Sequence, residues 1–212
     1  MASIADTILS PLSSLLSFGD KGYLTIDIGS SSIKILEVKG KGKSLRILNA
    51  GIVPLSSDVI RDNIVRNPTI VAEAIRSLVE DQGLQAINVL TVVPGPAVII
   101  KRANFPAQDQ KELRETILFE AGNFIPESLD NVNLDYQILD ASPDQDSVDV
   151  LLVAVRKDVI SSYTAAIEEA GLVPVVADVD YFALENMFET NYDLNPEETI
   201  ALINIGAHYS LV

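Results

Sequence analysis

Residues 23–39, YLTIDIGSSSIKILEVK, decide how we interpret the rest of this chain. An apolar run ends on Asp27, a glycine and three serines follow, and a second apolar run begins at Ile33. Apolar residues on both sides of a short polar segment predict two antiparallel strands joined by a tight turn. In that turn Gly29 would allow a backbone conformation that costs other residues energy.

The turn has the residue types of an anion-binding site. The backbone N–H groups of Gly29, Ser30 and Ser31 could converge on an anion, and Lys34 would lie near enough to contact it. Asp27 would repel a bare phosphate, so its expected role is to orient water around a divalent cation. Because the motif is short, the alternative is a plain glycine–serine hairpin with an ordinary aspartate at the strand end.

The far end of the chain repeats this pattern. Residues 201–207, ALINIGA, have the same pattern as residues 24–30, LTIDIGS. Ser210 comes six residues after Asn204. A repeated phosphate-turn pattern indicates two similar halves that hold one ligand between them. The repeat therefore favours a binding role for both turns.

Both turns resemble the phosphate motifs of the actin, heat-shock chaperone and sugar-kinase ATPase superfamily. Four residues stand at the offsets of that superfamily's first motif: Asp27, Gly29, Ser30 and Lys34. In the second motif Gly206 and Ser210 match, whereas Asn204 replaces the aspartate on the metal side. The superfamily's adenosine motif is missing from this sequence.

This resemblance implies an α/β protein with the actin-like (ribonuclease H-like) ATPase fold, here its first half, with ATP and Mg²⁺ as cofactors. Asp27 would hold Mg²⁺ indirectly, through water. An amide adds no negative charge and accepts no proton, so Asn204 favours weak or absent hydrolysis, and we expect no catalytic residues. The implied nucleotide contacts are Asp27, Gly29, Ser30, Ser31, Lys34, Asn204, Gly206 and Ser210.

Composition narrows the possible functions. The chain has 212 residues, no cysteine and one histidine, which excludes disulfides, thiolate metal sites and multi-histidine sites. Its net charge is −15, and the excess of acidic residues lies in residues 101–212. Such a surface would repel nucleic acid and anionic lipid headgroups. It would suit a basic partner, with an ordinary solvated acidic face as the alternative. We expect no membrane span and no signal peptide.

The remaining pattern predicts alternating strands and helices. Residues 44–53 predict a third strand, and Asn67 with Pro68 predicts the start of a helix that ends near Gly83. The apolar run 87–93 indicates a buried parallel strand. Beyond the boundary at Pro94–Pro96 we expect strand 97–104, helix 109–123, strands 131–139 and 147–155, helix 158–170, strand 173–178 and helix 181–190.

Four segments after this boundary stand out by their order and spacing: 117–121 (ILFEA), 132–136 (VNLDY), 152–157 (LVAVRK) and 179–185 (VDYFALE). Together they resemble one branch of the superfamily in particular, the PilM family of type IV pilus assembly proteins. The resemblance covers residues 22–212. It implies a tail 1–21, a first subdomain 22–96, an inserted FtsA/PilM-type βαββα subdomain 97–172, a return 173–198 and a truncated second half from 199 to 212.

Membership of that family would imply a cytoplasmic nucleotide-binding scaffold that serves pilus assembly and twitching motility. The expected partner is the cytoplasmic N-terminal peptide of the inner-membrane protein PilN, through which the scaffold would sit at the membrane. Other proteins of the assembly platform and further copies of the chain are also expected partners. Alternatives are an FtsA-like division filament protein, a type II secretion scaffold and an active phosphotransferase, the last disfavoured by Asn204.

Three other features have two interpretations each. The apolar residues of the tail 1–21 have helical spacing, which suits either a surface-seeking helix or a frayed or packed tail. His208 lies in the second turn, where it could contact a phosphate or face solvent. Asp178 and Asp180 would share one face of a strand, yet no nucleophile lies nearby, and acids are common at helix starts.

Overall fold

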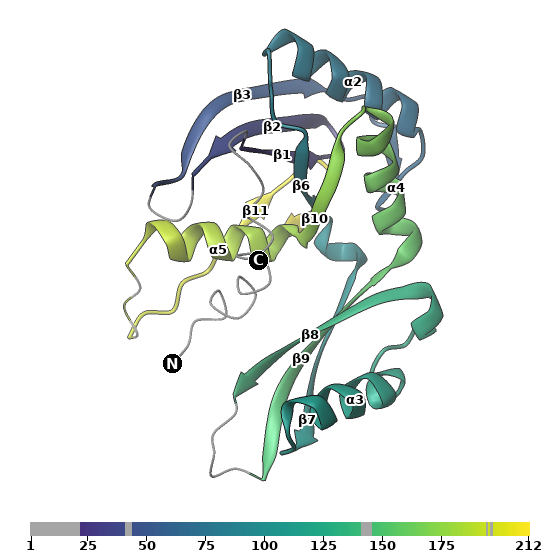
Figure 1. The fold of residues 1–212 in the computed structure, drawn as a ribbon, viewed down its shortest axis with the longest axis vertical. Coiled ribbons are helices and arrows are strands. Elements are labelled where there is room, and N and C mark those ends of the chain that lie inside the picture. The colour runs from purple at the N-terminus through teal and green to yellow at the C-terminus, as the bar shows by residue number, and fades with distance from the viewer. Residues whose placement is uncertain (1–21, 41–43, 141–145, 194, 196) are drawn as a thin grey trace. The chain divides into compact units, whose positions relative to one another are not determined.

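The computed structural model describes residues 22–40, 44–140, 146–193, 195 and 197–212, so the predicted tail 1–21 lies outside the described residues. The chain divides into two compact units (Figure 1). One contains residues 96–158, and we call it the insert unit. The other contains the described residues of 18–95 and 159–212, and we call it the sheet unit.

The sheet unit is built on a five-stranded mixed sheet in the order β10-β6-β1-β2-β3. β1, β2 and β3 form the predicted antiparallel meander, and β6 runs parallel to both β1 and β10, as expected for a buried central strand. The strands are β1 (Tyr23–Ile28), β2 (Ser32–Lys39), β3 (Arg46–Pro54), β6 (Asn88–Val93) and β10 (Val173–Val179).

Three helices accompany this sheet, α2 (Pro68–Asp81), α4 (Lys157–Glu169) and α5 (Asp180–Asn191). The predicted start of α2 is confirmed, because the Asn67 side chain accepts a hydrogen bond from Ile70 N–H at 3.3 Å. Ile70 itself is 41% exposed.

One strand glycine lets α2 approach the sheet closely. A Cβ added to Gly51 of β3 would lie 2.9 Å from Cδ2 of Leu78, a buried residue of α2. In Figure 1, α2 runs alongside β3. A side chain at this position would require the Leu78 side chain to move.

The insert unit is a three-stranded antiparallel sheet in the order β7-β9-β8 with one helix. Asp109 caps that helix by accepting hydrogen bonds from Lys111 and Glu112 N–H, both at 2.9 Å. Its elements are β7 (Val98–Pro106), α3 (Gln110–Glu120), β8 (Val132–Asp140) and β9 (Ser147–Arg156), with 3₁₀ turns Gly95–Ala97, Ala121–Asn123 and Leu129–Asn131. Its core contains Ala103, Phe105, Leu113, Ile117, Ile125, Val132, Val148, Val150, Leu152 and Ala154.

The insert unit is shorter than we expected, because it ends at Asp158 instead of residue 172. The residues of α4 from Val159 onward belong to the sheet unit. There the Ser162 hydroxyl accepts a hydrogen bond from Val65 N–H, and Arg76 donates to the Glu169 carbonyl. Helical periodicity predicted α4 correctly, but it carries no information about which sheet the helix contacts.

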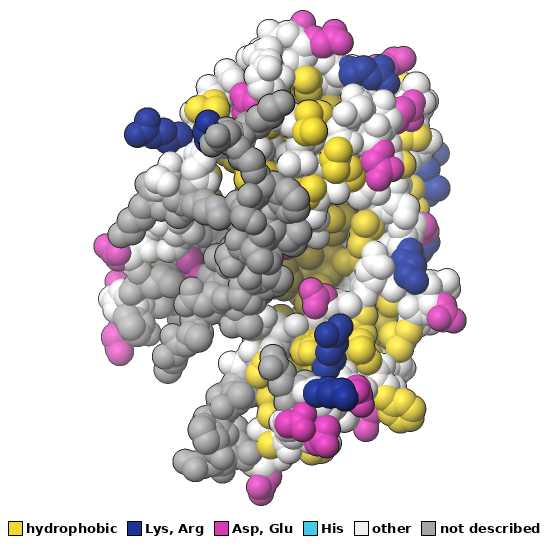
Figure 2. All heavy atoms as spheres, in the orientation of Figure 1, with side chains coloured by type: hydrophobic (Ala, Val, Ile, Leu, Met, Phe, Trp, Pro, Cys, Tyr) yellow, Lys and Arg dark blue, Asp and Glu magenta, His cyan; other side chains and the backbone are white. Residues whose placement is uncertain are grey.

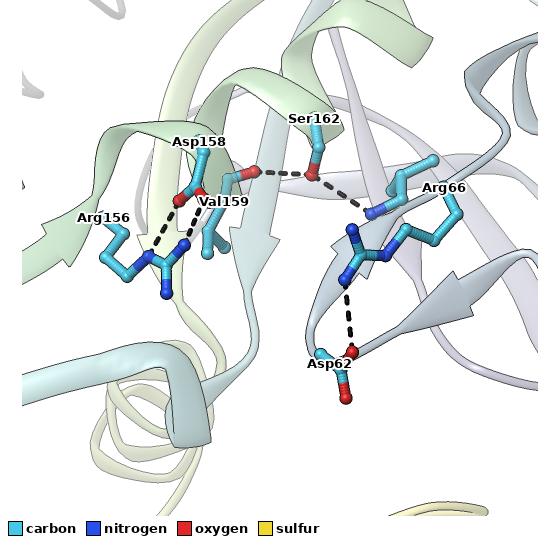
Figure 3. A network of polar contacts seen from close by, with 7 residues as sticks. Asp62, Arg66, Arg156, Asp158, Val159 and Ser162 are labelled. Atoms are coloured by element: carbon cyan, nitrogen blue, oxygen red, sulfur yellow. Dashed lines mark hydrogen bonds and ion pairs between the residues drawn. The ribbon is translucent and has the colours of Figure 1, made fainter. Parts of the chain in front are cut away.

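Basic and acidic side chains are interspersed on the visible face of the insert unit, in the lower part of Figure 2. At the end of β9, Arg156 makes two hydrogen bonds to Asp158 (Figure 3). The described residues of this face offer no extended basic stripe of the kind that a nucleic acid backbone requires. Among the described residues no helix is long and apolar enough to cross a bilayer.

Candidate functional site

The first predicted turn, between β1 and β2, is closed by a hydrogen bond from Gly29 N–H to the Ser32 carbonyl at 3.0 Å. Gly29 is not among the residues with positive φ, so our expectation of a special backbone conformation was wrong. A Cβ at this position would lie 3.1 Å from the Ser32 oxygen, which makes close approach the reason for glycine. The Gly29 N–H is also already used, so it is not free for an anion.

The second turn has the same local geometry. It joins β11 (Asn204–Ile205) to β12 (Ser210–Leu211), and Gly206 N–H donates to the Tyr209 carbonyl at 3.0 Å. A Cβ on Gly206 would lie 2.8 Å from that carbonyl oxygen. Each turn is thus closed by a bond from a glycine to the residue three positions later. The sequence repeat is therefore also a structural repeat.

A small cavity of about 50 Å³ brings the two turns together within the sheet unit. Asp27, Gly29 and Ser30 contribute from the first turn, and His208 and Tyr209 from the second. The cavity also has walls from Ile28, Ile60, Asp62, Asn63, Val92, Pro94, Tyr163 and Asp180. Three of the lining side chains are carboxylates, so the cavity suits a cation.

Asp27 and Lys34 lie opposite each other on β1 and β2 and form an ion pair with 2.7 Å between Nζ and Oδ2. We had expected Lys34 to contact an anion beside the turn. Instead it donates a hydrogen bond to Asp27, and it is not among the residues that line the cavity. Both side chains are about half exposed, at 52% and 49%, so the pair contributes little to stability.

Asp180 connects three separate segments at this site. Its Oδ1 accepts from Gly95 N–H at 2.9 Å and from Tyr181 N–H at 2.8 Å, and its Oδ2 accepts from the Tyr209 hydroxyl at 2.7 Å. These bonds join the end of β6, the start of α5 and the second turn. Asp180 is thus the first residue of a helix, as its position after a strand suggested, but it also anchors the second turn.

The surroundings of Asp180 alter its proton affinity and that of nearby tyrosines. Burial raises the pKa of Asp180, with a smaller contribution from the charge of Asp27, against the opposing effect of its hydrogen bonds. Burial, followed by the charges of Asp180 and Asp178, raises the pKa of Tyr181 to about 12. Burial, together with the hydrogen bond to Asp180, also raises the pKa of Tyr209. The Tyr209 hydroxyl therefore remains a hydrogen-bond donor at neutral pH.

A second and larger cavity, of about 310 Å³, adjoins the first and shares Ser30, Ile60, Asp62 and His208 with it. The other lining residues are Ser31, Leu55, Ser57, Arg61 and Ala207. An arginine, several serines and a turn of backbone are groups that bind phosphate. The volume is at the lower end of the roughly 300–1,000 Å³ of small-molecule sites.

Both cavities share a wall that we did not predict, a short hairpin of β4 (Ile60–Arg61) and β5 (Ile64–Val65). The two residues between its strands, Asp62 and Asn63, have φ angles of 54° and 61°, as a type I′ turn requires. The Asp-Asn pair between Ile60-Arg61 and Ile64-Val65 was the available sequence signal.

Several hydrogen bonds hold this hairpin in place (Figure 3). Val65 N–H donates to the Ser162 hydroxyl at 3.2 Å, and that hydroxyl donates to the Val159 carbonyl at 2.7 Å. Arg66 donates to Asp62 at 3.2 Å. The hairpin is thereby attached to α4.

The structure places the predicted contact residues in two groups. Asp27, Gly29, Ser30 and Ser31 line one or both cavities. Lys34 is paired with Asp27, and Asn204, Gly206 and Ser210 form the second turn without lining either cavity. The site residues that sequence reasoning missed are Arg61, Asp62, Tyr163, Asp180 and Tyr209.

The side chains present fit a hydrated Mg²⁺. Within the described part of the chain, no group of three or more His, Asp or Glu side chains is placed to hold a metal ion. Asp27, Asp62 and Asp180 line the smaller cavity, where their carboxylates would hold the cation through its water ligands. Mg²⁺ commonly keeps several of its water ligands in proteins.

Comparison with known proteins identifies the family. The family model described as type IV pilus assembly protein PilM matches residues 25–212. This chain belongs to the PilM family.

The most informative solved structure is a PilM–PilN type IV pilus biogenesis complex, which the chain matches with a TM-score of 0.68 and 29% sequence identity. The match covers 77% of this chain and 48% of that chain, so the sequence spans about half the length of its relative. The chain has the α/β, actin-like (ribonuclease H-like) ATPase fold that PilM-family membership implied, with a small inserted α+β unit.

Two weaker matches are the cytoplasmic domain of EpsL, an inner membrane component of the type II secretion system of Vibrio cholerae, and a protein of unknown function with an actin-like ATPase fold from Bacteroides thetaiotaomicron. The first has a TM-score of 0.49, 14% identity and coverage of 76% of this chain and 58% of that chain. The second has a TM-score of 0.35, 12% identity and coverage of 78% and 56%. Neither supports an inference of function.

Proposed function

We propose that this PilM-family chain is part of a cytoplasmic nucleotide-binding scaffold of the type IV pilus assembly machinery. The observation that carries the nucleotide assignment is that two adjoining cavities lie beside two matching turns. The smaller cavity has three carboxylates, and the larger one has Arg61 and three serines besides the shared Asp62. A hydrated Mg²⁺ would suit the carboxylates, and the phosphates that accompany it would suit Arg61 and the serines.

In this proposal Asp27 orients water molecules around Mg²⁺, and the serine turn holds phosphate. Mg²⁺, when bound, would reduce the negative charge of the phosphates. Asn204 offers an amide where the resembling superfamily has a carboxylate, so hydrolysis is expected to be weak or absent. The protein would then act through nucleotide-dependent conformations instead of turnover.

The proposed partner is a PilN-like inner-membrane protein, which would recruit this scaffold to the membrane through its cytoplasmic N-terminal peptide. The support is the similarity to the solved PilM–PilN type IV pilus biogenesis complex. A PilN-like peptide should bind the full-length protein in a fluorescence anisotropy titration, with a scrambled peptide as the control. Equal binding of the two peptides would refute the proposed partner.

The nucleotide assignment is tested by Asp27→Asn, measured by calorimetry with Mg-ATP. Asparagine keeps the shape of the side chain and its contact with Lys34, but it removes the charge that orients water around the cation. We expect affinity for Mg-ATP to fall by about tenfold, the effect of one charge-assisted contact. The control is Asp193→Ala, which removes an exposed carboxylate outside both cavities. Unchanged affinity in Asp27→Asn would remove Asp27 from the site.

A further inference from the structure

Lys34, the cation that we expected beside the first turn, is not available to bind phosphate. Lys34 donates to Asp27 at 2.7 Å and lines neither cavity. The smaller cavity has carboxylates from Asp27, Asp62 and Asp180, which repel a phosphate. A bound phosphate therefore needs a positive side chain from another element.

Arg61 is in a position to supply this charge. It lines the larger cavity, to which Ser30 and Ser31 of the first turn also contribute, together with His208 and the carboxylate of Asp62. Its present partner is Asp58, at 3.2 Å. Because the two side chains are 67% and 86% exposed, their ion pair is weak and its exchange for another anion costs little.

The backbone that carries Arg61 is held firmly. Asp62 and Asn63 form the left-handed turn that follows it, and Arg66 N–H donates to the Val59 carbonyl at 2.8 Å on the opposite side. The bond from Val65 N–H to Ser162 then attaches the hairpin to α4. An arginine on a fixed backbone loses less conformational freedom on binding than one on a flexible loop.

We propose that Arg61, on the β4–β5 hairpin, is a phosphate-binding residue of this protein, and that it exchanges Asp58 for a nucleotide phosphate. The inference rests on the proposed nucleotide binding, and it adds the hairpin as a third element beside the two turns. The planar guanidinium can donate two parallel hydrogen bonds to phosphate oxygens, which an ammonium cannot.

The test is calorimetry of the full-length protein and its variants with Mg-ATP and with adenosine. Arg61→Gln should weaken Mg-ATP binding by about tenfold or more, the loss expected for a charge-assisted hydrogen bond, and should leave adenosine binding unchanged. Arg61→Lys should restore part of the affinity, because it restores the charge without the two-pronged geometry.

The matched control is Arg46→Gln, which removes the same charge from an exposed residue at the far end of the β2–β3 pair, opposite Lys39. It should bind Mg-ATP as the unmodified protein does. If the unmodified protein does not bind Mg-ATP, the proposed function fails. If it binds and Arg61→Gln binds equally well, or loses Mg-ATP and adenosine affinity alike, the role of Arg61 as a phosphate contact is overturned.

Discussion

Glu37 is a buried charged residue that stabilises the sheet unit. It lies on β2 and is 3% exposed. Its carboxylate accepts hydrogen bonds from Gln85 N–H at 2.9 Å, Ala86 N–H at 3.0 Å and the Asn49 amide at 2.7 Å. Burial opposes ionisation, but the bonds from Gln85, Asn49 and Ala86 outweigh it and lower the pKa of Glu37. One side chain thus joins β2, β3 and the segment that leads into β6.

Replacing Glu37 with Gln should lower the free energy of unfolding at pH 7 by about 1–3 kcal/mol, because the three donors lose their charged acceptor. Because the pKa of Glu37 is lower in the folded state, its charge stabilises the folded protein at pH values above the unfolded-state pKa of about 4.5. This stabilisation is lost as the pH falls through the folded-state pKa. The difference between the two proteins in urea denaturation should therefore shrink as pH falls through this range. Glu73→Gln, at an exposed position of α2, is the control. If the difference in the free energy of unfolding stays constant with pH, the loss of stability comes from the changed shape of the side chain and not from its charge.

At the scale of single elements, the longer hairpins and the helix starts that depend on neighbouring residues in the sequence were predictable. The β1–β2 hairpin, the Asn67 cap of α2 and the Asp109 cap of α3 each follow from residues within a few positions of one another. The β4–β5 hairpin was missed because each strand has only two residues, too few for a periodic signal. The partners of Asp180 were not predictable either, since Gly95 and Tyr209 lie 85 and 29 residues away in the chain.

The second turn gives a prediction about turnover. Asn204 is exposed on β11, so a substitution there disturbs no packing. Asn204→Asp would supply the carboxylate of the resembling motif, and we expect any basal ATP hydrolysis to rise by up to about a hundredfold, the usual value of one preorganised charge. Phosphate release measures it, with Asn133→Asp of the insert unit as a control of equal charge. Fast hydrolysis by the unmodified protein would show that Asn204 does not limit turnover.

At the scale of the whole molecule, the chain consists of two compact units with separate cores. Alternating apolar residues indicated the strands of both, yet the boundary of the insert unit was misplaced because the contacts of α4 are long-range. In the insert unit, Phe105 is 1% exposed and packs edge-to-face on Phe124 with 5.8 Å between ring centroids. Phe119 of α3, in contrast, is 87% exposed.

Phe105→Ala should therefore destabilise the insert unit by about 3–5 kcal/mol, the usual cost of removing a buried aromatic side chain. Hydrogen exchange should rise in β7, β8 and β9 and stay unchanged in β1, β2 and β6, because the two units have different cores. Phe119→Ala is the matched control and should leave exchange unchanged in both units. A rise throughout the chain in Phe105→Ala would show that the two units unfold together.

The bond between Tyr209 and Asp180 also gives this protein an optical reporter. Residues 1–212 contain no tryptophan and six tyrosines, so tyrosine dominates their ultraviolet emission. A carboxylate that accepts a hydrogen bond from a phenol quenches the emission of that phenol, and Tyr209 donates to Asp180 at 2.7 Å. Any ligand that pulls the second turn away from α5 would relieve this quenching. Movement at the site can therefore be followed by the tyrosine fluorescence of the unlabelled protein. The reference is Tyr209→Phe, which lacks the quenched phenol.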